Sequence, residues 1–133
     1  MMANVVRTER GWAGHFIRAC RCGFRRNTLL DAGTVKVVVS TVGNYTTTGF
    51  RNGWGEISPG RAAETMAFVA HLEKTKSGAR YWDADVGREV FFTSRWSLSM
   101  DECTDDHVIN EMHEAVVDEI AHALKKGRLQ EVG

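Results

Sequence analysis

The 133-residue sequence contains no apolar run near the roughly 18 residues that a membrane-spanning helix needs. Its first twelve residues also lack an apolar run long enough for a signal peptide. With three cysteines, every disulfide scheme leaves one unpaired, and Cys20 and Cys22 stand too close for an unstrained bridge. We therefore expect reduced thiols, no membrane partner and a cytoplasmic location.

The familiar catalytic and metal-binding motifs are also missing. There is no glycine-rich phosphate loop with a lysine, no GxSxG, no HExxH and no CxxC. His15, Cys20 and Cys22 are a poor zinc set because paired zinc cysteines need longer spacing. Cys103 has His107 four residues on, but no oxyanion site accompanies the pair. The sequence predicts no metal, no cofactor and no enzymatic activity.

The formal net charge is zero, but the two signs are unevenly spread. Residues 1–66 carry nine basic and four acidic side chains, and residues 67–133 carry eight basic and thirteen acidic ones. This asymmetry permits an anion-binding face, and equally permits the halves to complement each other in the fold or across an oligomer interface. The zero net charge argues against an inhibitor that mimics DNA, because such mimics are strongly acidic.

Period-two patterns predict a strand-rich core. Val35–Val42 is β-branched and apolar, and an Asp-Ala-Gly-Thr turn predicts a hairpin between Asn27–Leu30 and Lys36–Ser40. A long polar, glycine-rich loop is expected over Gly43–Gly60. For Glu64–Leu72 we favour a strand over a helix.

Two further elements follow these strands. After a turn at Lys74–Gly78, we expect a hairpin of Tyr81–Val86 and Arg88–Thr93 over Val86-Gly87. The last element, about residues 104–126, has an apolar stripe of helical period. The stripe comprises Val108, Met112, Ala115, Val116, Ile120, Ala123 and Leu124.

The ends of this helix also carry signals. Ser99 and Glu102 match the capping-box pattern, Thr104 or Asp105 is an alternative N-cap, and Gly127 supplies the C-cap. His113, Glu114 and Asp118 are expected on the solvated side. The prediction is one α+β domain over residues 1–133. An antiparallel core of short strands, about 5–98, precedes the amphipathic C-terminal helix.

Arginines, aromatics and acids indicate a nucleotide site. Arg25 and Arg26 are adjacent on a strand, so they point to opposite faces, and arginine forks suit phosphate oxygens. Such residues also occur as plain surface charges, and aromatic residues are often core. The candidate ligand-binding residues are Arg25, Arg26, Asn27, Arg61, Phe68, Arg80, Trp82 and Asp83. The arginines would bind phosphates, Phe68 or Trp82 would stack on a base, and Asn27 and Asp83 would bond ribose or base edges.

Several stretches resemble one known family. RTERGWAGHFI, FRRNTLL, VVVSTVG, ETMAF, RYWDADVGREV and NEMHEAVVDEIAHALKKG are similar to the Thoeris anti-defence (type one) sponge family of phages. The resemblance covers about residues 5–129. It implies a protein of the infected bacterial cytoplasm that sequesters cyclic ADP-ribose isomers, and in some members cyclic oligonucleotides, without cleaving them. It also implies a homo-oligomer built from dimers into a hexamer, with the helix stripe partly at the dimer interface.

Three alternatives stay open. The first is a protein-binding inhibitor of a bacterial defence effector, as anti-CRISPR proteins are. The second is a nucleotide-processing enzyme using Asp83, Asp85 or Glu64 as acid or base. The third is an RNA-binding module, although no nucleic acid polymer is expected as partner.

Overall fold

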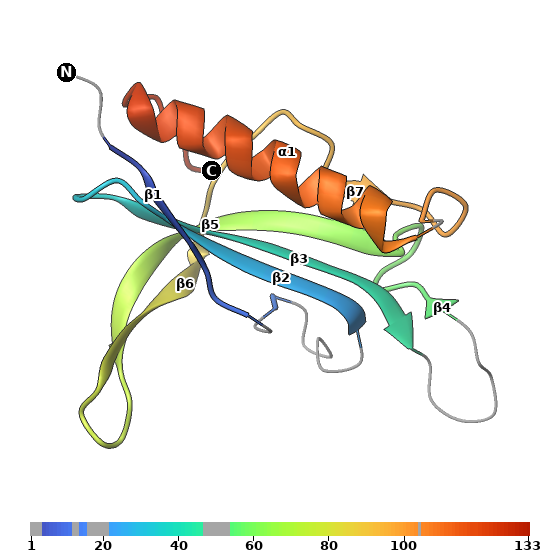
Figure 1. Cartoon of the computed structure of the whole chain (residues 1–133), viewed down its shortest axis with the longest axis horizontal. Coiled ribbons are helices and arrows are strands. Elements are labelled where there is room, and N and C mark those ends of the chain that lie inside the picture. The colour runs from blue at the N-terminus through green and yellow to red at the C-terminus, as the bar shows by residue number, and fades with distance from the viewer. Residues whose placement is uncertain (1–3, 12–13, 16–21, 47–53, 104) are drawn as a thin grey trace.

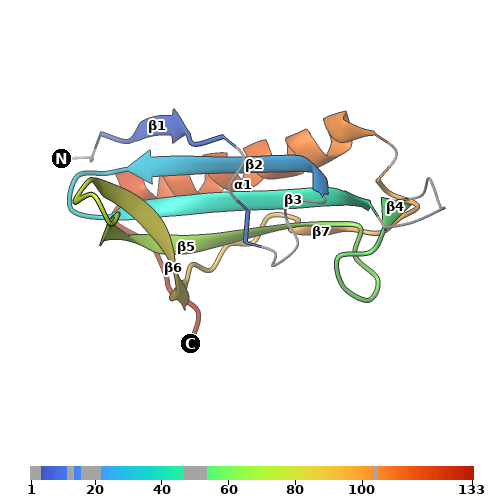
Figure 2. The same ribbon diagram turned by 90° about the horizontal axis from the view of Figure 1, so that it is seen from below.

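The computed structural model describes residues 4–11, 14–15, 22–46, 54–103 and 105–133. They form one antiparallel sheet of seven strands and one helix (Figures 1 and 2). The strands are β1 (Val6–Glu9), β2 (Cys22–Asp31), β3 (Lys36–Thr46), β4 (Trp54–Gly55), β5 (Ala63–Lys74), β6 (Arg80–Glu89) and β7 (Ser97–Leu98). Their order is β1-β2-β3-β5-β6, with β4 beside β3 and β7 beside β5. The predicted α+β class is confirmed.

Helix α1 (Asp106–Lys125) lies along one face of this sheet (Figure 2). Its buried stripe packs on inward-facing side chains of β2, β3 and β5, because alternate residues of a strand share one face. The main core cluster comprises Leu30, Val37, Val39, Ala67, Val69, Val90, Val116, Val117, Ile120 and Leu124. Four members of the predicted stripe are therefore buried within a single chain, namely Met112, Val116, Ile120 and Leu124. The inclusion of Ala115 in the stripe was wrong, because this residue is exposed. No helix of the described residues is long and apolar enough to cross a membrane.

The helix ends follow local sequence signals. The Asp105 side chain accepts the N–H of Val108 and is the N-cap, as one of the predicted alternatives had it. Ser99 and Glu102 do exchange reciprocal hydrogen bonds, but they close a turn before the helix begins. Gly127 has φ +64° and follows the helix in a left-handed conformation that glycine adopts without strain.

The hairpin of β2 and β3 is confirmed, with Leu30 opposite Val37 and Asn27 opposite Ser40. At its turn, the Asp31 carboxylate accepts the N–H of Gly33 at 2.8 Å. Strand β3 extends to Thr46, so the loop predicted from Gly43 begins later than expected. Residues 47–53 of that predicted loop lie outside the described residues.

Strand β5 confirms the preference for a strand at Glu64–Leu72, and the predicted turn after it is present. The second predicted hairpin is wrong, because Arg80–Glu89 is one strand paired with β5. Between the pairs Ala70–Ala84 and Phe68–Glu89, β6 has more residues than β5. The extra residues, around Val86-Gly87, form a bulge, which a turn-prone dipeptide suits equally well.

Candidate functional site

The face of the sheet opposite α1, here called the helix-free face, carries a grid of side chains from β2, β3 and β5. Strand register aligns them in three rows. The rows are Arg25–Val42–Glu64, Asn27–Ser40–Met66 and Leu29–Val38–Phe68. Three predicted ligand residues, Arg25, Asn27 and Phe68, therefore share this face.

His15 lies over this grid and bonds two of its members. Its Nε2 is 2.9 Å from the Glu64 carboxylate, and its Nδ1 is 2.9 Å from the Ser40 hydroxyl. The backbone N–H of His15 also donates to Ser40 Oγ at 3.1 Å. When Nε2 carries the proton and donates to Glu64, Nδ1 accepts from Ser40. Ser40, His15 and Glu64 thus form a chain of hydrogen bonds. The His15 side chain is only 6% exposed, so the middle of this chain has little contact with solvent.

Glu64 connects this chain to the edge of the sheet. Its second carboxylate oxygen accepts from Arg61 at 3.3 Å, and the Arg61 guanidinium lies 4.3 Å from the centre of the Trp96 ring. The hydrogen bond from His15, opposed by burial, holds the pKa of Glu64 below its usual range. Glu64 is therefore an anion fixed at both oxygens.

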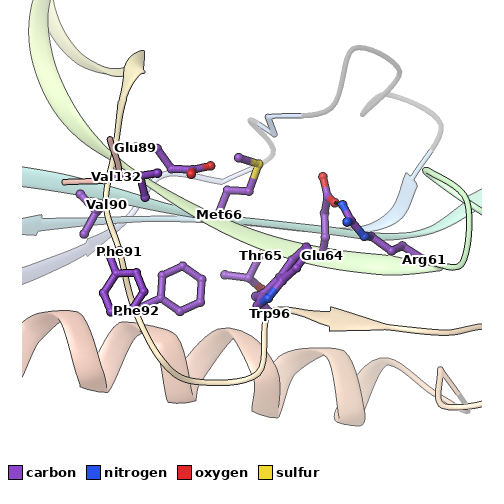
Figure 3. Close-up of a pocket in the computed structure, with 10 residues that line it drawn as sticks. All are labelled: Arg61, Glu64, Thr65, Met66, Glu89, Val90, Phe91, Phe92, Trp96 and Val132. Carbon is purple, nitrogen blue, oxygen red and sulfur yellow. Dashed lines mark hydrogen bonds and ion pairs between the residues drawn. The ribbon is translucent and has the colours of Figure 1, made fainter. Parts of the chain in front are cut away.

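A cavity of about 370 Å³ opens beside this pair, where the chain leaves β6 and returns as β7 (Figure 3). Arg61, Glu64 and Trp96 gather at one end of the cavity, and Phe91 and Phe92 lie at the other. The remaining lining residues are Thr65, Met66, Glu89, Val90 and Val132. Trp96 and Phe91 are 40% and 52% exposed, so flat apolar surface is available to a ligand.

Asn27 adds an unused acceptor to the helix-free face. The residue is 5% exposed, and its Oδ1 finds no hydrogen-bond partner among the described residues. A buried acceptor without a donor is unfavourable by about 1–3 kcal/mol, but Asn27 does not line the Arg61 cavity described above.

A second polar chain runs on the helix side of the same strands. Thr65 bonds Thr41 at 2.6 Å, Thr41 bonds His113 Nδ1 at 2.6 Å, and His113 Nε2 bonds Thr28 at 2.7 Å. Thr28 donates to Glu9 at 2.9 Å. Because Thr28 gives its proton to Glu9, it accepts from Nε2, and the other threonines donate towards Nδ1.

The placement of His113 on the solvated side of the helix was therefore wrong, since the residue is fully buried. Desolvation, helped by the nearby charge of Arg26, lowers its pKa to about 4. The helical periodicity did not predict the burial of His113, because histidine is counted as a polar residue even when apolar residues lie beside it. Only the threonines of the facing strands make its burial favourable.

The other predicted site residues are dispersed. Arg26 points to the helix side, where it is paired with Glu9 and Glu114 at 2.8 Å each. Arg80, Trp82 and Asp83 lie on β6, where the Trp82 ring sits 4.2 Å from the Lys36 ammonium. Of the eight predicted residues, the structure thus gathers Arg25, Asn27 and Phe68 on one face and joins Arg61 to it through Glu64.

Sequence reasoning missed His15 and Trp96 as members of this site. The alternation of side chains along β3 could have indicated that Ser40 and Thr41 face opposite sides of the sheet. It could not have indicated which histidine bonds to each of these two residues. Among the described residues, no cluster of three metal-ligating side chains is present, and Cys20 lies outside them. Burial and the charge of Asp106 raise the pKa of Cys103, which disfavours a reactive thiolate.

Comparisons with known proteins give no relative: no protein-family model, curated protein or solved structure matches this chain.

Proposed function

We propose that this protein binds a nucleotide-type signal and sequesters it without cleavage, as the resemblance to the phage anti-defence sponges implies. The observation that carries the proposal is the stack of Arg61 on Trp96 beside Glu64, at the mouth of the cavity. These three groups match the parts of a nucleotide, because bases stack, phosphates need cations and ribose hydroxyls need acceptors.

Each chemical part of the ligand has a partner in this proposal. The exposed faces of Trp96 and Phe91 stack on the base, and Arg61 binds a phosphate oxygen. Glu64 and Glu89 accept hydroxyl protons of ribose. Two carboxylates against one guanidinium disfavour a ligand with many phosphate charges. The charge of the cavity therefore disfavours cyclic trinucleotides, which carry three phosphate charges, more than cyclic ADP-ribose isomers, which carry two.

Sequestration is favoured over turnover by the burial of Ser40. The order Ser40–His15–Glu64 resembles the nucleophile, base and acid of hydrolases, and it is the observation that favours a nucleotide-processing enzyme instead. Ser40, however, is only 2% exposed, and its oxygen already accepts the N–H of His15. A nucleophile so placed cannot reach a ligand in the cavity without rearrangement.

Isothermal titration calorimetry of the full chain tests the proposal. The titrants are cyclic ADP-ribose isomers and cyclic di- and trinucleotides, and bound ligand is recovered by heat denaturation and identified by mass spectrometry. We expect at least one cyclic ADP-ribose isomer to bind and to be recovered intact. Binding of none of these ligands would refute the sponge function. Recovery of degraded ligand, abolished by Ser40→Ala, would make the protein an enzyme.

Matched variants locate the site. Arg61→Gln and Trp96→Ala should each weaken binding about tenfold or more, because each removes one ligand contact at a partly desolvated wall. Arg95→Gln is the control, since Arg95 is a neighbouring exposed arginine paired with Glu102 outside the cavity. Equal loss in all three variants would contradict the assignment to this cavity.

We also propose, on the same resemblance, a homo-oligomer in the cytoplasm of an infected bacterium. Size-exclusion chromatography with light scattering gives the oligomeric state directly. A monomer would count against the family resemblance. Capture of one defence effector, with no nucleotide bound, would instead support a protein-binding inhibitor.

A further inference from the structure

A second hollow lies around the end of α1, and two of its lining residues, Arg88 and Glu131, directly precede Glu89 and Val132 of the Arg61 cavity in the chain. We call it the basic groove, and its volume is about 710 Å³. The β2–β3 turn, the last turn of α1 and the C-terminal tail form its walls. The lining residues are Ala32, Thr34, Val35, Val69, Arg88, Leu124, Lys125, Lys126, Gly127, Arg128, Leu129 and Glu131.

The cations of this groove are not needed to close the helix. Cationic side chains near a helix end often bond its last carbonyl groups. Here backbone N–H groups do so: residues 126, 127 and 128 donate to the carbonyl oxygens of His122, Leu124 and Ala123 at 3.1, 3.2 and 2.8 Å. The side chains of the groove therefore remain available to another group.

Three of its cations are also not neutralised. Lys125, Lys126 and Arg128 are exposed, and none forms an ion pair with a carboxylate of the described residues. Arg88 differs, because Glu131 holds its guanidinium with two hydrogen bonds of 2.9 and 2.8 Å. The groove thus carries a net positive charge on one wall.

Its floor is apolar. Val35 is 37% exposed, and Val69 and Leu124 are 6% exposed each. Phosphate groups gain nothing from such a floor, whereas an aliphatic side chain buries surface there at roughly 25 cal/mol per Å². The groove therefore favours an occupant with both carboxylates and an apolar side chain.

We propose that the basic groove is a docking site for an acidic peptide segment of a partner protein. In this arrangement the peptide's carboxylates face Lys125, Lys126 and Arg128, and one aliphatic side chain rests on Val35. Opposite charge steers the encounter and the apolar contact sets the register. This inference is independent of the nucleotide function, because the two sites share no residue.

Fluorescence anisotropy with a labelled Gly-Glu-Asp-Leu-Glu-Asp-Gly peptide tests the proposal on the full chain. We expect saturable, salt-sensitive binding that weakens about tenfold in the triple variant Lys125→Gln, Lys126→Gln, Arg128→Gln. A peptide with Gly in place of Leu should bind more weakly, and Val35→Ser should remove that difference. The control variant is Lys74→Gln, Lys76→Gln, which removes two exposed cations at the β5–β6 turn.

Four results would overturn the proposal. The first is peptide binding that the triple variant leaves unchanged while its circular dichroism stays native. The second is equal affinity for the Leu and Gly peptides, which would show that binding depends on charge alone and not on the apolar floor of the groove. The third is stronger binding of single-stranded DNA or of phosphatidylserine vesicles through the same three residues. The fourth is self-association that the peptide fails to inhibit and the triple variant abolishes, which would assign the groove to a second copy.

Discussion

Ser40 and Thr41 are neighbours on β3, yet each hydrogen-bonds a different histidine on an opposite face of the sheet. Ser40 bonds His15 on the helix-free face, and Thr41 bonds His113 beneath the helix. The two chains reach β5 at the adjacent residues Glu64 and Thr65, both of which line the cavity. Alternation along a strand thus places two separate polar networks on either side of one sheet.

The burial of His113 makes stability depend on pH. Its folded pKa of about 4 lies below the ordinary value of 6.5, so the unfolded chain binds the proton more tightly. The stabilisation is complete above pH 6.5 and is lost as pH falls towards 4, by about 3 kcal/mol in total. Glu114, with a pKa of about 2, stays ionised over this window.

Urea unfolding at pH 7, 6, 5 and 4 measures this loss. His113→Gln should flatten the profile, while His107→Gln, at an exposed helix position, should leave it unchanged. If the free energy of unfolding of His113→Gln falls with pH as steeply as that of the unmutated protein, other groups cause the acid sensitivity.

Thr41→Val should destabilise the fold by breaking the chain beneath the helix. Valine fills the space but leaves the Thr65 hydroxyl without an acceptor and His113 Nδ1 without a donor. The expected loss in the free energy of unfolding is about 1–3 kcal/mol. Thr8→Val on the exposed strand β1 is the control and should change it by less than about 0.5 kcal/mol. Equal effects would mean that the chain contributes no stability.

Gly43→Ala should destabilise through a clash. A Cβ at Gly43 would lie 2.8 Å from the Ala63 Cβ and 3.0 Å from Ile109 Cδ1, between β5 and the helix. Overpacking of this kind costs about 1–3 kcal/mol, measurable by thermal or urea unfolding. Gly87→Ala meets only the flexible Asp85 carboxylate, at 3.3 Å, and should lose less. The reverse ranking would contradict this packing.

Met112→Asp should unfold the chain and not merely dissociate an oligomer. Met112 is 5% exposed and packs with Ala63, Leu98 and Ile109 within one chain, so a buried carboxylate would cost about 3 kcal/mol or more. Ala115→Asp, on the exposed side of α1, keeps the core intact. Circular dichroism and light scattering of both variants separate the cases. If Met112→Asp stays folded but loses assembly, the stripe belongs to an interface between copies.

Much of the fold could be predicted locally. Val35–Val42 is a strand because β-branched side chains favour an extended backbone, and Gly127 ends α1 because it adopts a positive φ without strain. The bulge of β6 could not be predicted in this way. Val86-Gly87 suits a turn as well as a bulge, and only pairing with β5 decides between them.

Side-chain periodicity and turn chemistry are enough to predict the α+β class, the β2–β3 hairpin, the strand at β5 and the C-terminal helix. The burial of His113, the hydrogen bond between His15 and Glu64 and the stacking of Arg61 on Trp96 follow only from the folded chain. These contacts join residues that are distant in the sequence. Whether a polar side chain is buried depends on the partners that strand register brings opposite it, and no local pattern specifies that register.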